Sequence, residues 1–393
     1  KIESQPLLAN VNKNRIVMLD ALRGFALMGI LFVHHIEHFG LWYAPVFHPD
    51  WLISIDKWVS QNVFLLFGGK SFALFSLLFG FSYWLIYESA KNRGEAYIFR
   101  HFWRMALLMV FGAVQIMYYR GDILIMYAVL GMPLIFTRYM SNRAIIITAV
   151  VLLLNPVSLY TIGSFLFGSE VYNFKMSYPK VDLRKSLMQD SFLEIVKMNY
   201  LFGHQKVVLW SWNVGRILTI PGLFLIGVYF ARSKSFTDRP MQFWYSLLVA
   251  SLIGWLCFDM ISDVWAMNIN DKPSRKLLQS IMSSYVNLFM MLCILSSFII
   301  IWRHNDGNVF IAKFANFGRM GLTNYLLMSL IGVMLYYGWG FSLYQYCGST
   351  ITLFIGIFVL MLQMKFSSYW LERHSQGPLE NLWRKATWVA SKR

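Results

Sequence analysis

The chain has 393 residues, of which 57% are hydrophobic, 18% aromatic and only 14% charged. Soluble domains are about 45 to 50% apolar and about 25% charged, so this composition excludes a soluble globular protein. Lys and Arg number 35 against 19 Asp and Glu, which gives a net charge of +16. The basic residues lie between long apolar runs, so membrane topology accounts for them and nucleic acid is not expected as a partner.

Apolar segments recur along the chain, each close to the roughly 20 residues that a membrane-crossing helix needs. They are 17–37, 62–87, 104–119, 123–137, 144–167, 213–231, 242–263, 278–302, 318–338 and 349–368. The sequence therefore predicts an all-α, polytopic bundle of about ten transmembrane helices, with residues 1–393 in a single transmembrane domain. The first segment lacks a small-residue cleavage site, so we expect it to remain as a helix.

Lys and Arg are distributed unequally between the two sides of this predicted bundle. The connections on the side of the two termini carry roughly twice as many of them as the opposite side, where one long loop holds most. Long loops count little toward orientation. We therefore expect both termini in the cytoplasm and the protein in the plasma (inner) membrane.

Two segments are expected to lie outside the hydrocarbon core. Residues 168–212 form a loop too long for a simple connection, predicted on the outer side. Apolar and charged residues alternate within it from Asp190 to Leu201, which is typical of a short interfacial helix. Residues 369–393 combine tryptophans with basic residues, as expected of a cytoplasmic interfacial tail.

The first predicted helix carries a polar stripe. At about 100° per residue, Asp20, Arg23, His34 and His38 share one face and Glu37 lies beside it. The stripe rises about 27 Å, nearly the thickness of the hydrocarbon. Charged groups at this depth normally face the interior of the bundle, so the helix is expected to line a polar cavity. Asp20 and Arg23 are expected to pair, because they are three residues apart.

His34 is the candidate general base, because a neutral imidazole takes up and returns a proton near neutral pH. Glu37 would orient it, and Arg23 and Asp20 complete the set of candidate catalytic residues. The alternative is a structural histidine that only donates a hydrogen bond. A metal site is not predicted, because the helix-one histidines offer only one good pair on a face and no metal-ligand spacing occurs elsewhere. The cysteines show no pair spacing, so disulfides are not expected either.

Lys70 follows two glycines and is predicted near the membrane midplane. Adjacent glycines can break a helix where its backbone faces protein or water. Lys70 would then bind an anionic substrate group such as a phosphate or carboxylate. The alternative is an ion pair with Asp20 that only joins two helices.

Further polar groups are expected to converge near the outer end of the first helix, with the long loop as a lid. Together with Lys70, the candidate substrate-binding residues are Arg120, Asp122, Arg216, Asn324 and His38. For Arg120 and Asp122 the alternative is a pair with each other in a surface turn. For Asn324 the alternative is a hydrogen bond to a neighbouring helix.

Several ordered motifs resemble those of the YeiB-like integral membrane proteins, a family named for a domain of unknown function, 418. The segments that carry the resemblance are Arg15–Leu31, Gly69–Gly80, Gly121–Ala128, Gly318–Leu326 and Gly377–Arg384. They span nearly the whole chain. His34 departs from the Asn that many members of that family carry at this position.

The first helix of the YeiB-like family is similar to that of transmembrane acyltransferases of the acyltransferase family 3 and heparan N-acetyltransferase types. Acyltransferase family 3 carries an Arg, ten residues and then a His, and Arg23 and His34 have this spacing. The resemblance implies acyl transfer from cytoplasmic acyl-CoA to a hydroxyl or amine acceptor that is outside or in the membrane. Acyl-CoA would be a co-substrate, with no permanently bound cofactor.

In that mechanism basic groups such as Arg100, Arg104, Arg319 or Lys70 would meet the phosphates of CoA, while Asn324 or Lys70 would stabilise the oxyanion. The alternative function is a transporter, or a membrane protein that binds a lipid or small molecule, because a polar stripe with a midplane lysine also describes a substrate pathway. A purely structural role is the third hypothesis. Membrane lipids are expected partners, and a homo-oligomer is a further possible partner state.

Overall fold

The computed structural model describes residues 17–39, 45, 47–167, 176–189, 191–304 and 309–389, and within these ranges every regular element is a helix. The first half contains α1 (Val17–His34), η1 (His35–Phe39), α2 (Asp50–Phe67), α3 (Lys70–Asn92), α4 (Tyr97–Ile116), α5 (Leu124–Gly131), η2 (Met132–Tyr139), α6 (Asn142–Leu154) and α7 (Pro156–Leu166). Next come α8 (Leu183–Leu187), α9 (Phe192–Met198), η3 (Asn199–Gly203), α10 (His204–Asn213), α11 (Arg216–Arg232) and α12 (Ser235–Asp238). The chain continues with α13 (Met241–Asn268), α14 (Lys272–His304), α15 (Val309–Arg319), α16 (Gly321–Tyr336), η4 (Leu343–Gln345), α17 (Ser349–Arg373) and α18 (Pro378–Val389).

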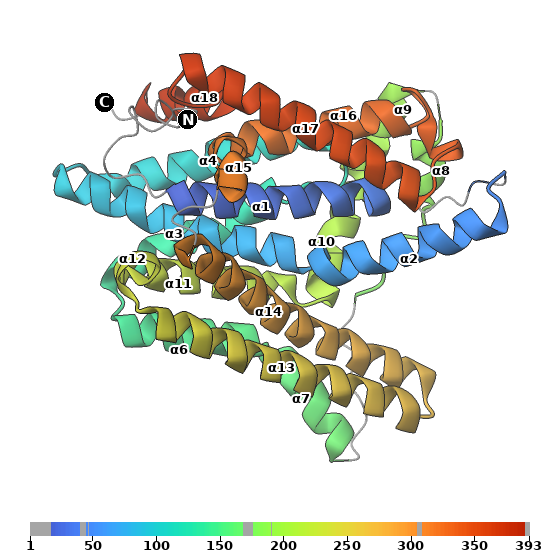
Figure 1. Cartoon of the computed structure of the whole chain (residues 1–393), viewed down its shortest axis with the longest axis horizontal. Helices are drawn as coiled ribbons and strands as arrows, with labels where there is room; N and C mark the ends of the chain where they lie inside the picture. Colours follow the sequence, from blue (N-terminus) through green and yellow to red (C-terminus); the bar gives the residue numbers. More distant parts are fainter. Residues whose placement is uncertain are drawn as a thin grey trace, which may run out of the picture.

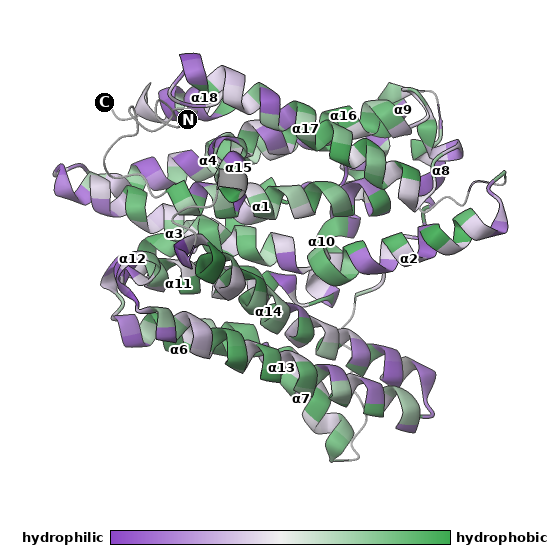
Figure 2. Cartoon of the chain, viewed as in Figure 1, coloured by the Kyte–Doolittle hydropathy of each residue, from purple (hydrophilic) through white to green (hydrophobic). Residues whose placement is uncertain are grey.

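The long helices run roughly parallel, with α12 and α18 near one end of the bundle and α8 and α9 near the other (Figure 1). These are called the α18 end and the α9 end. Hydrophobic residues cover the middle of α6, α13 and α14, and hydrophilic residues gather toward the helix ends (Figure 2). This banding is expected of a protein that spans a bilayer, so the all-helical membrane class predicted from the sequence is confirmed.

The predicted number of ten spans is not confirmed. By length and composition, five stretches of the described chain can cross a membrane, or seven if each of two bent helix pairs is one span. The stretches of Leu124–Tyr139 and Gly321–Tyr336 are apolar but shorter. Helix α4 is 20 residues long but includes Arg100, His101 and Arg104. The ten apolar segments thus all coincide with helices, but not all of them have the length and composition of a span.

The segment predicted as a span at 62–87 is two helices. Helices α2 and α3 lie end to end and form one stretch of 43 residues that is interrupted at Gly68 and Gly69 (Figure 1). Gly69 has a φ of 76°, a left-handed conformation that glycine adopts without strain. The predicted span starts at residue 62, inside α2, because polar and apolar side chains are mixed along that helix and no apolar run marks its beginning.

Two other predicted spans are bent. Helices α6 and α7 meet at 50°, and the stretch from α9 through α10 meets α11 at 72°. The first bend lies at Asn155, with a φ of 48° and Pro156 next to it, and the second lies at Gly215, with a φ of 75°. Both residues are in the left-handed region, which ends a helix. Tyr285 donates a hydrogen bond to the Leu154 carbonyl at the first break, at 2.6 Å.

Glycines allow two pairs of helices to cross at backbone contact. A Cβ atom on Gly318 of α15 would lie 1.9 Å from the carbonyl oxygen of Asp20 on α1. A Cβ on Gly227 of α11 would lie 2.0 Å from the carbonyl oxygen of Leu77 on α3. Small residues allow this close approach in membrane bundles. One crossing holds α1 to α15 and the other holds α3 to α11, and these helices form much of the wall of the cavity described below.

The long loop and the C-terminal tail both contain helices, of which the sequence predicts only a short one in the loop. Within 168–212 the described residues form α8, α9, η3 and α10, and Ile195 of α9 is buried against a cluster that includes Tyr336 and Tyr337. The loop is therefore packed onto the bundle. Helix α17 extends to Arg373, so the tail proper begins with α18, which packs on α4 and α16.

Candidate functional site

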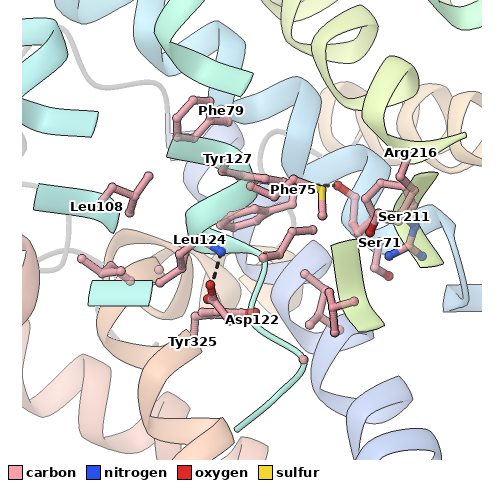
Figure 3. Close-up of a pocket in the computed structure, with 18 of the residues that line it drawn as sticks. Ser71, Phe75, Phe79, Leu108, Asp122, Leu124, Tyr127, Ser211, Arg216 and Tyr325 are labelled. Atoms are coloured by element: carbon pink, nitrogen blue, oxygen red, sulfur yellow. Dashed lines mark hydrogen bonds between the residues drawn. The ribbon is translucent and has the colours of Figure 1, made fainter. Parts of the chain in front are cut away.

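A cavity of about 680 Å³ lies inside the bundle, lined by α1, α3, α4, α5, α10, α11, α16 and α18. It extends along α1 from Arg23 to Glu37, which is about 20 Å of helix. Aromatic side chains such as Phe75, Phe79 and Tyr127 form one wall (Figure 3). The cavity thus combines an apolar wall with polar groups along its whole length, as ligand sites commonly do.

Helix α1 supplies the polar stripe predicted from the sequence. Arg23, His34 and Glu37 all line the cavity. Arg23 donates a hydrogen bond to Asp20 at 2.9 Å, so the predicted pair is confirmed, and a second one to Ser82 at 2.8 Å. Asp20 itself is buried behind Arg23 and is not part of the cavity wall. The aspartate therefore supports a cavity group without facing the ligand space.

His34 lies among aromatic rings. It is buried, and its ring centroid is 5.3 Å from that of Tyr119 and 6.3 Å from that of Tyr325. Tyr325 also lines the cavity. The neighbouring His35 is not in the cavity wall, because its Nδ1 lies 3.1 Å from the hydroxyl of Tyr336 on α16. The two adjacent histidines thus face different surroundings, as their 100° separation on the helix predicts.

Asp122 and Arg120 belong to the turn between α4 and α5 and both line the cavity. The carboxylate of Asp122 accepts hydrogen bonds from the backbone N–H groups of Leu124 at 2.9 Å and Ile125 at 3.1 Å, which begin α5 (Figure 3). Asp122 therefore caps α5 and does not form an ion pair with Arg120. The Arg120 Nη1 atom is buried and has no hydrogen-bond partner among the described residues.

Arg216 begins α11 directly after the bend at Gly215 and lines the cavity on the side of Ser71 and Ser211 (Figure 3). Its guanidinium carbon lies 3.9 Å from the ring centroid of Phe72 and 4.2 Å from that of Trp210. Stacking between two rings fixes the plane of the guanidinium and leaves its N–H edge available for a ligand. The sequence prediction that Arg216 lies in a substrate cavity agrees with this position.

The half of the cavity toward the α18 end is also basic. Arg104 and Arg319 line it together with Arg23. The Arg104 guanidinium carbon lies 4.5 Å from the ring centroid of Trp383 on α18. The carboxylate of Glu380 on α18 lines the same region, but it is bound to the first turn of α16. Cations thus outnumber uncommitted carboxylates here, which suits an anionic ligand.

Two of the three remaining candidate residues are not brought into the cavity wall. The Lys70 Nζ donates to the carbonyl oxygen of Phe64 at 3.2 Å, which also accepts from the backbone N–H of Gly68 at 2.9 Å. Asn324 donates to the Phe317 carbonyl oxygen and the Ser367 hydroxyl, both at 2.9 Å. Asn324 therefore joins neighbouring helices, which is the alternative given for it above. The side chain of the third, His38, lies outside the described residues.

Sequence reasoning missed Lys206 and Trp210, which line the cavity from α10. The prediction treated 168–212 as a loop at the interface, whereas α10 enters the bundle beside α11. A signal was present, since half of the positions in His204–Asn213 are apolar and Arg216 follows shortly after this segment. Within the described ranges no three His, Cys, Asp or Glu side chains are grouped so that they could hold a metal ion.

Residues 230–390 match a family model described as "Protein of unknown function (DUF418)". The chain is 27% identical to the Uncharacterized protein YxaH of Bacillus subtilis (strain 168), with 98% of this chain and 96% of that protein covered. It is also 27% identical to the Uncharacterized protein YeiB of Escherichia coli (strain K12), with 95% and 96% covered.

These similarities support the resemblance to the YeiB-like proteins. They do not extend to the transmembrane acyltransferases, and no solved structure matches the chain. The match to the family model lies in α11 to α18 and so contains Arg319 and Glu380, but not the polar stripe of α1. The relatives cover both halves of the cavity, since their similarity runs over nearly the whole chain.

Proposed function

We propose that the protein is a membrane-bound acyltransferase that moves an acyl group from acyl-CoA to a hydroxyl or amine acceptor. The observation that supports this proposal is that His34 and Glu37 line the same continuous cavity as the basic groups of the α18 end. In the proposal the α18 end is cytoplasmic, because the short connections that carry most of the Lys and Arg lie there. The acceptor then enters from the α9 end.

Acyl-CoA would be held by the cations of the α18 end. Arg104 and Arg319 are placed to meet its phosphates, and a guanidinium binds phosphate oxygens in a bidentate manner. From Arg23 to His34 the distance along α1 is about 16 Å, which an extended pantetheine arm can bridge. The aromatic wall around Phe75 and Phe79 would take the acyl chain.

His34 would act as the general base. It takes the proton of the acceptor hydroxyl or amine while the acceptor oxygen or nitrogen attacks the thioester carbonyl carbon. The tetrahedral intermediate then expels the CoA thiolate, and His34 returns the proton to the sulfur, so the products are the acylated acceptor and free CoA. Glu37 faces the same cavity one turn beyond His34 and stabilises the positive charge of the imidazolium.

The decisive experiment measures acyl-CoA binding and CoA release by the purified protein in lipid nanodiscs. The parent protein is compared with His34→Ala and with His304→Ala, a histidine that is exposed and bonded to Tyr245 outside the cavity. We expect saturable binding in all three and a loss of CoA release, by about 100-fold or more, only in His34→Ala. Equal release by His34→Ala would remove His34 from the mechanism, and no binding at any acyl length would overturn acyl transfer.

A second function, the transport of an anionic amphiphile, is favoured by a separate observation. Two helix pairs are bent, at Asn155 and at Gly215, and Arg216, which lines the cavity, follows the second bend. Discontinuous helices often form the substrate site of transporters. Uptake of an anionic amphiphile into proteoliposomes without CoA, sensitive to Arg216→Gln, would select this function over acyl transfer.

A further inference from the structure

The half of the cavity toward the α9 end contains three cations from three different elements. Arg120 belongs to the turn after α4, Lys206 to α10 and Arg216 to α11, and all three line the cavity. Arg120 and Lys206 are close enough to repel each other electrostatically. Arg120 also lies beside Gly203, where a Cβ would be 3.1 Å from the Arg120 Cβ. The chain thus folds these like charges toward one space.

The protein does not neutralise this cluster by direct pairing. None of the three cations forms an ion pair within 4.0 Å in the part of the chain that the structure describes. Glu37 attracts Arg216, and Asp182 attracts Lys206, but at longer range. The carboxylate of Asp122 is occupied by the first turn of α5. Charges held in an apolar bundle are costly unless a partner compensates them, so the missing partner is expected to be a ligand.

The arrangement of donors indicates which ligand would fit. Arg216 presents its N–H edge from between two rings, Arg120 offers a buried Nη1 without a partner, and Lys206 adds a compact ammonium. A carboxylate has only two oxygens for these donors, whereas a phosphate group offers three or four and carries up to two charges. Trp210 and Phe72 supply an apolar surface directly beside the cations.

We propose that Arg120, Lys206 and Arg216 form a binding site for the phosphate group of an amphipathic phosphate ester. Under the acyl-transfer function proposed above, this ester is the acceptor, and its hydroxyl lies on the His34 side of the phosphate. The binding site itself does not depend on that function. Two sources share the chemistry: the headgroup of a phospholipid that enters from the bilayer, and a phosphate ester dissolved on the side of the α9 end.

The experiment is a binding measurement without acyl-CoA, so it is independent of acyl transfer. Purified protein in detergent is titrated separately with phosphatidic acid, with soluble glycerol phosphate and with neutral phosphatidylcholine, and thermal unfolding reports binding. We expect saturable stabilisation by one of the two phosphate monoesters and none by phosphatidylcholine. The arm that responds identifies the source of the ligand.

Substitutions then locate the site. Arg216→Gln and Lys206→Gln should each weaken binding by about tenfold or more, the effect of losing one hydrogen bond from a charged group. Lys197→Gln is the matched control, because Lys197 is exposed on α9 and does not line the cavity. Lys206 is half-buried and forms no hydrogen bond with the described residues, so its variant should fold even if Arg216→Gln does not.

Two results would overturn the site: no saturable binding of either ester, or equal weakening by Lys197→Gln and the two cavity variants. Binding that depends on Arg216 and Lys206, together with unchanged CoA release in His34→Ala, would retain the phosphate site and reject the acyl-transfer mechanism. The converse result, His34-dependent CoA release with no phosphate binding, would retain the enzyme and reject a phosphate-bearing acceptor.

Discussion

Glu380 and Thr323 are joined by two hydrogen bonds at the α18 end of the cavity. The Glu380 carboxylate accepts from the Thr323 hydroxyl at 2.6 Å and from its backbone N–H at 3.0 Å, and a third bond comes from the N–H of Leu322 at 2.7 Å. In return, the Thr323 hydroxyl accepts from the N–H of Leu379 at 3.1 Å. The start of α18 thus caps the first turn of α16, where N–H groups lack helix partners.

Glu380→Ala should therefore release α18 from the bundle. Losing hydrogen bonds to a charged acceptor is expected to cost about 2 to 3 kcal/mol, and amide hydrogens of α18 should exchange faster while those of α1 do not change. Hydrogen exchange with mass spectrometry measures both. Glu372→Ala is the control, because Glu372 is exposed on α17. Unchanged exchange in α18 would mean that Trp383 and its neighbours hold the helix without Glu380.

Gly318→Ala should separate α1 from α15. The added Cβ would lie 1.9 Å from the Asp20 carbonyl oxygen, and a backbone atom cannot move aside alone. Overpacking of this kind costs about 1 to 3 kcal/mol, so the apparent melting temperature should fall by several degrees. Gly163→Ala on α7 is the matched control, since a Cβ there meets nothing within 4 Å. Equal melting temperatures for both variants would contradict the close crossing.

Glu95 lies in the turn between α3 and α4, and because of it the folded state should lose stability as the pH becomes acidic. Hydrogen bonds from Arg93 and Arg100 lower the pKa of its carboxyl group to about 2. A lowered carboxyl pKa stabilises the folded state fully above the ordinary value of about 4.5, and this contribution is lost as the pH falls toward 2.

The melting temperature of the parent should thus fall between pH 5 and pH 2 more steeply than that of Glu95→Gln. The two proteins should become similar near pH 2. Glu88→Gln, which removes an exposed carboxylate of α3, should follow the parent over the same range. Parallel curves for the parent and Glu95→Gln would show that the two arginines do not stabilise the charged carboxylate.

Lys70→Met tests the boundary of the cavity. Lys70 is buried and its ammonium binds the Phe64 carbonyl, but only its neighbours Gly69 and Ser71 line the cavity. Stability should change by less than about 1 kcal/mol, because the lost hydrogen bond is offset by removing a buried charge. Phosphate-ester binding should equal that of the parent. A tenfold loss of binding would instead place Lys70 in the site.

The sequence predicts the helical class and the position of nearly every apolar helix, because apolar run length is a direct consequence of bilayer thickness. It indicates the break at Gly68 and Gly69 but not the other two. Asn155 and Gly215 interrupt apolar runs that look continuous, and both have a left-handed backbone in the structure. Similarly, Arg100 and Arg104 lie on a helix whose length suits a span but whose composition does not, so the number of spans cannot be counted from apolar runs alone.

The candidate site is predicted best on α1. Helical periodicity is sufficient to place Arg23, His34 and Glu37 on one face, and all three line the cavity. The parts of the site whose positions depend on tertiary packing are predicted poorly. Lys70 turns back to its own chain and donates to the Phe64 carbonyl at the end of the preceding helix. Lys206 contributes because α10 enters the bundle, and the interpretation of 168–212 as a loop overlooked the apolar residues of that helix.

The two broken spans touch at their breaks. A Cβ on Gly215 would lie 2.3 Å from the side-chain Nδ2 of Asn155, so the two bends are in contact. We therefore expect a movement of the α6–α7 bend to be transmitted to the α10–α11 bend. Arg216 follows the α10–α11 bend directly. A displacement of α7, far from either end of the cavity, is therefore expected to move the guanidinium of Arg216. This movement would change the affinity of the cavity for an anion.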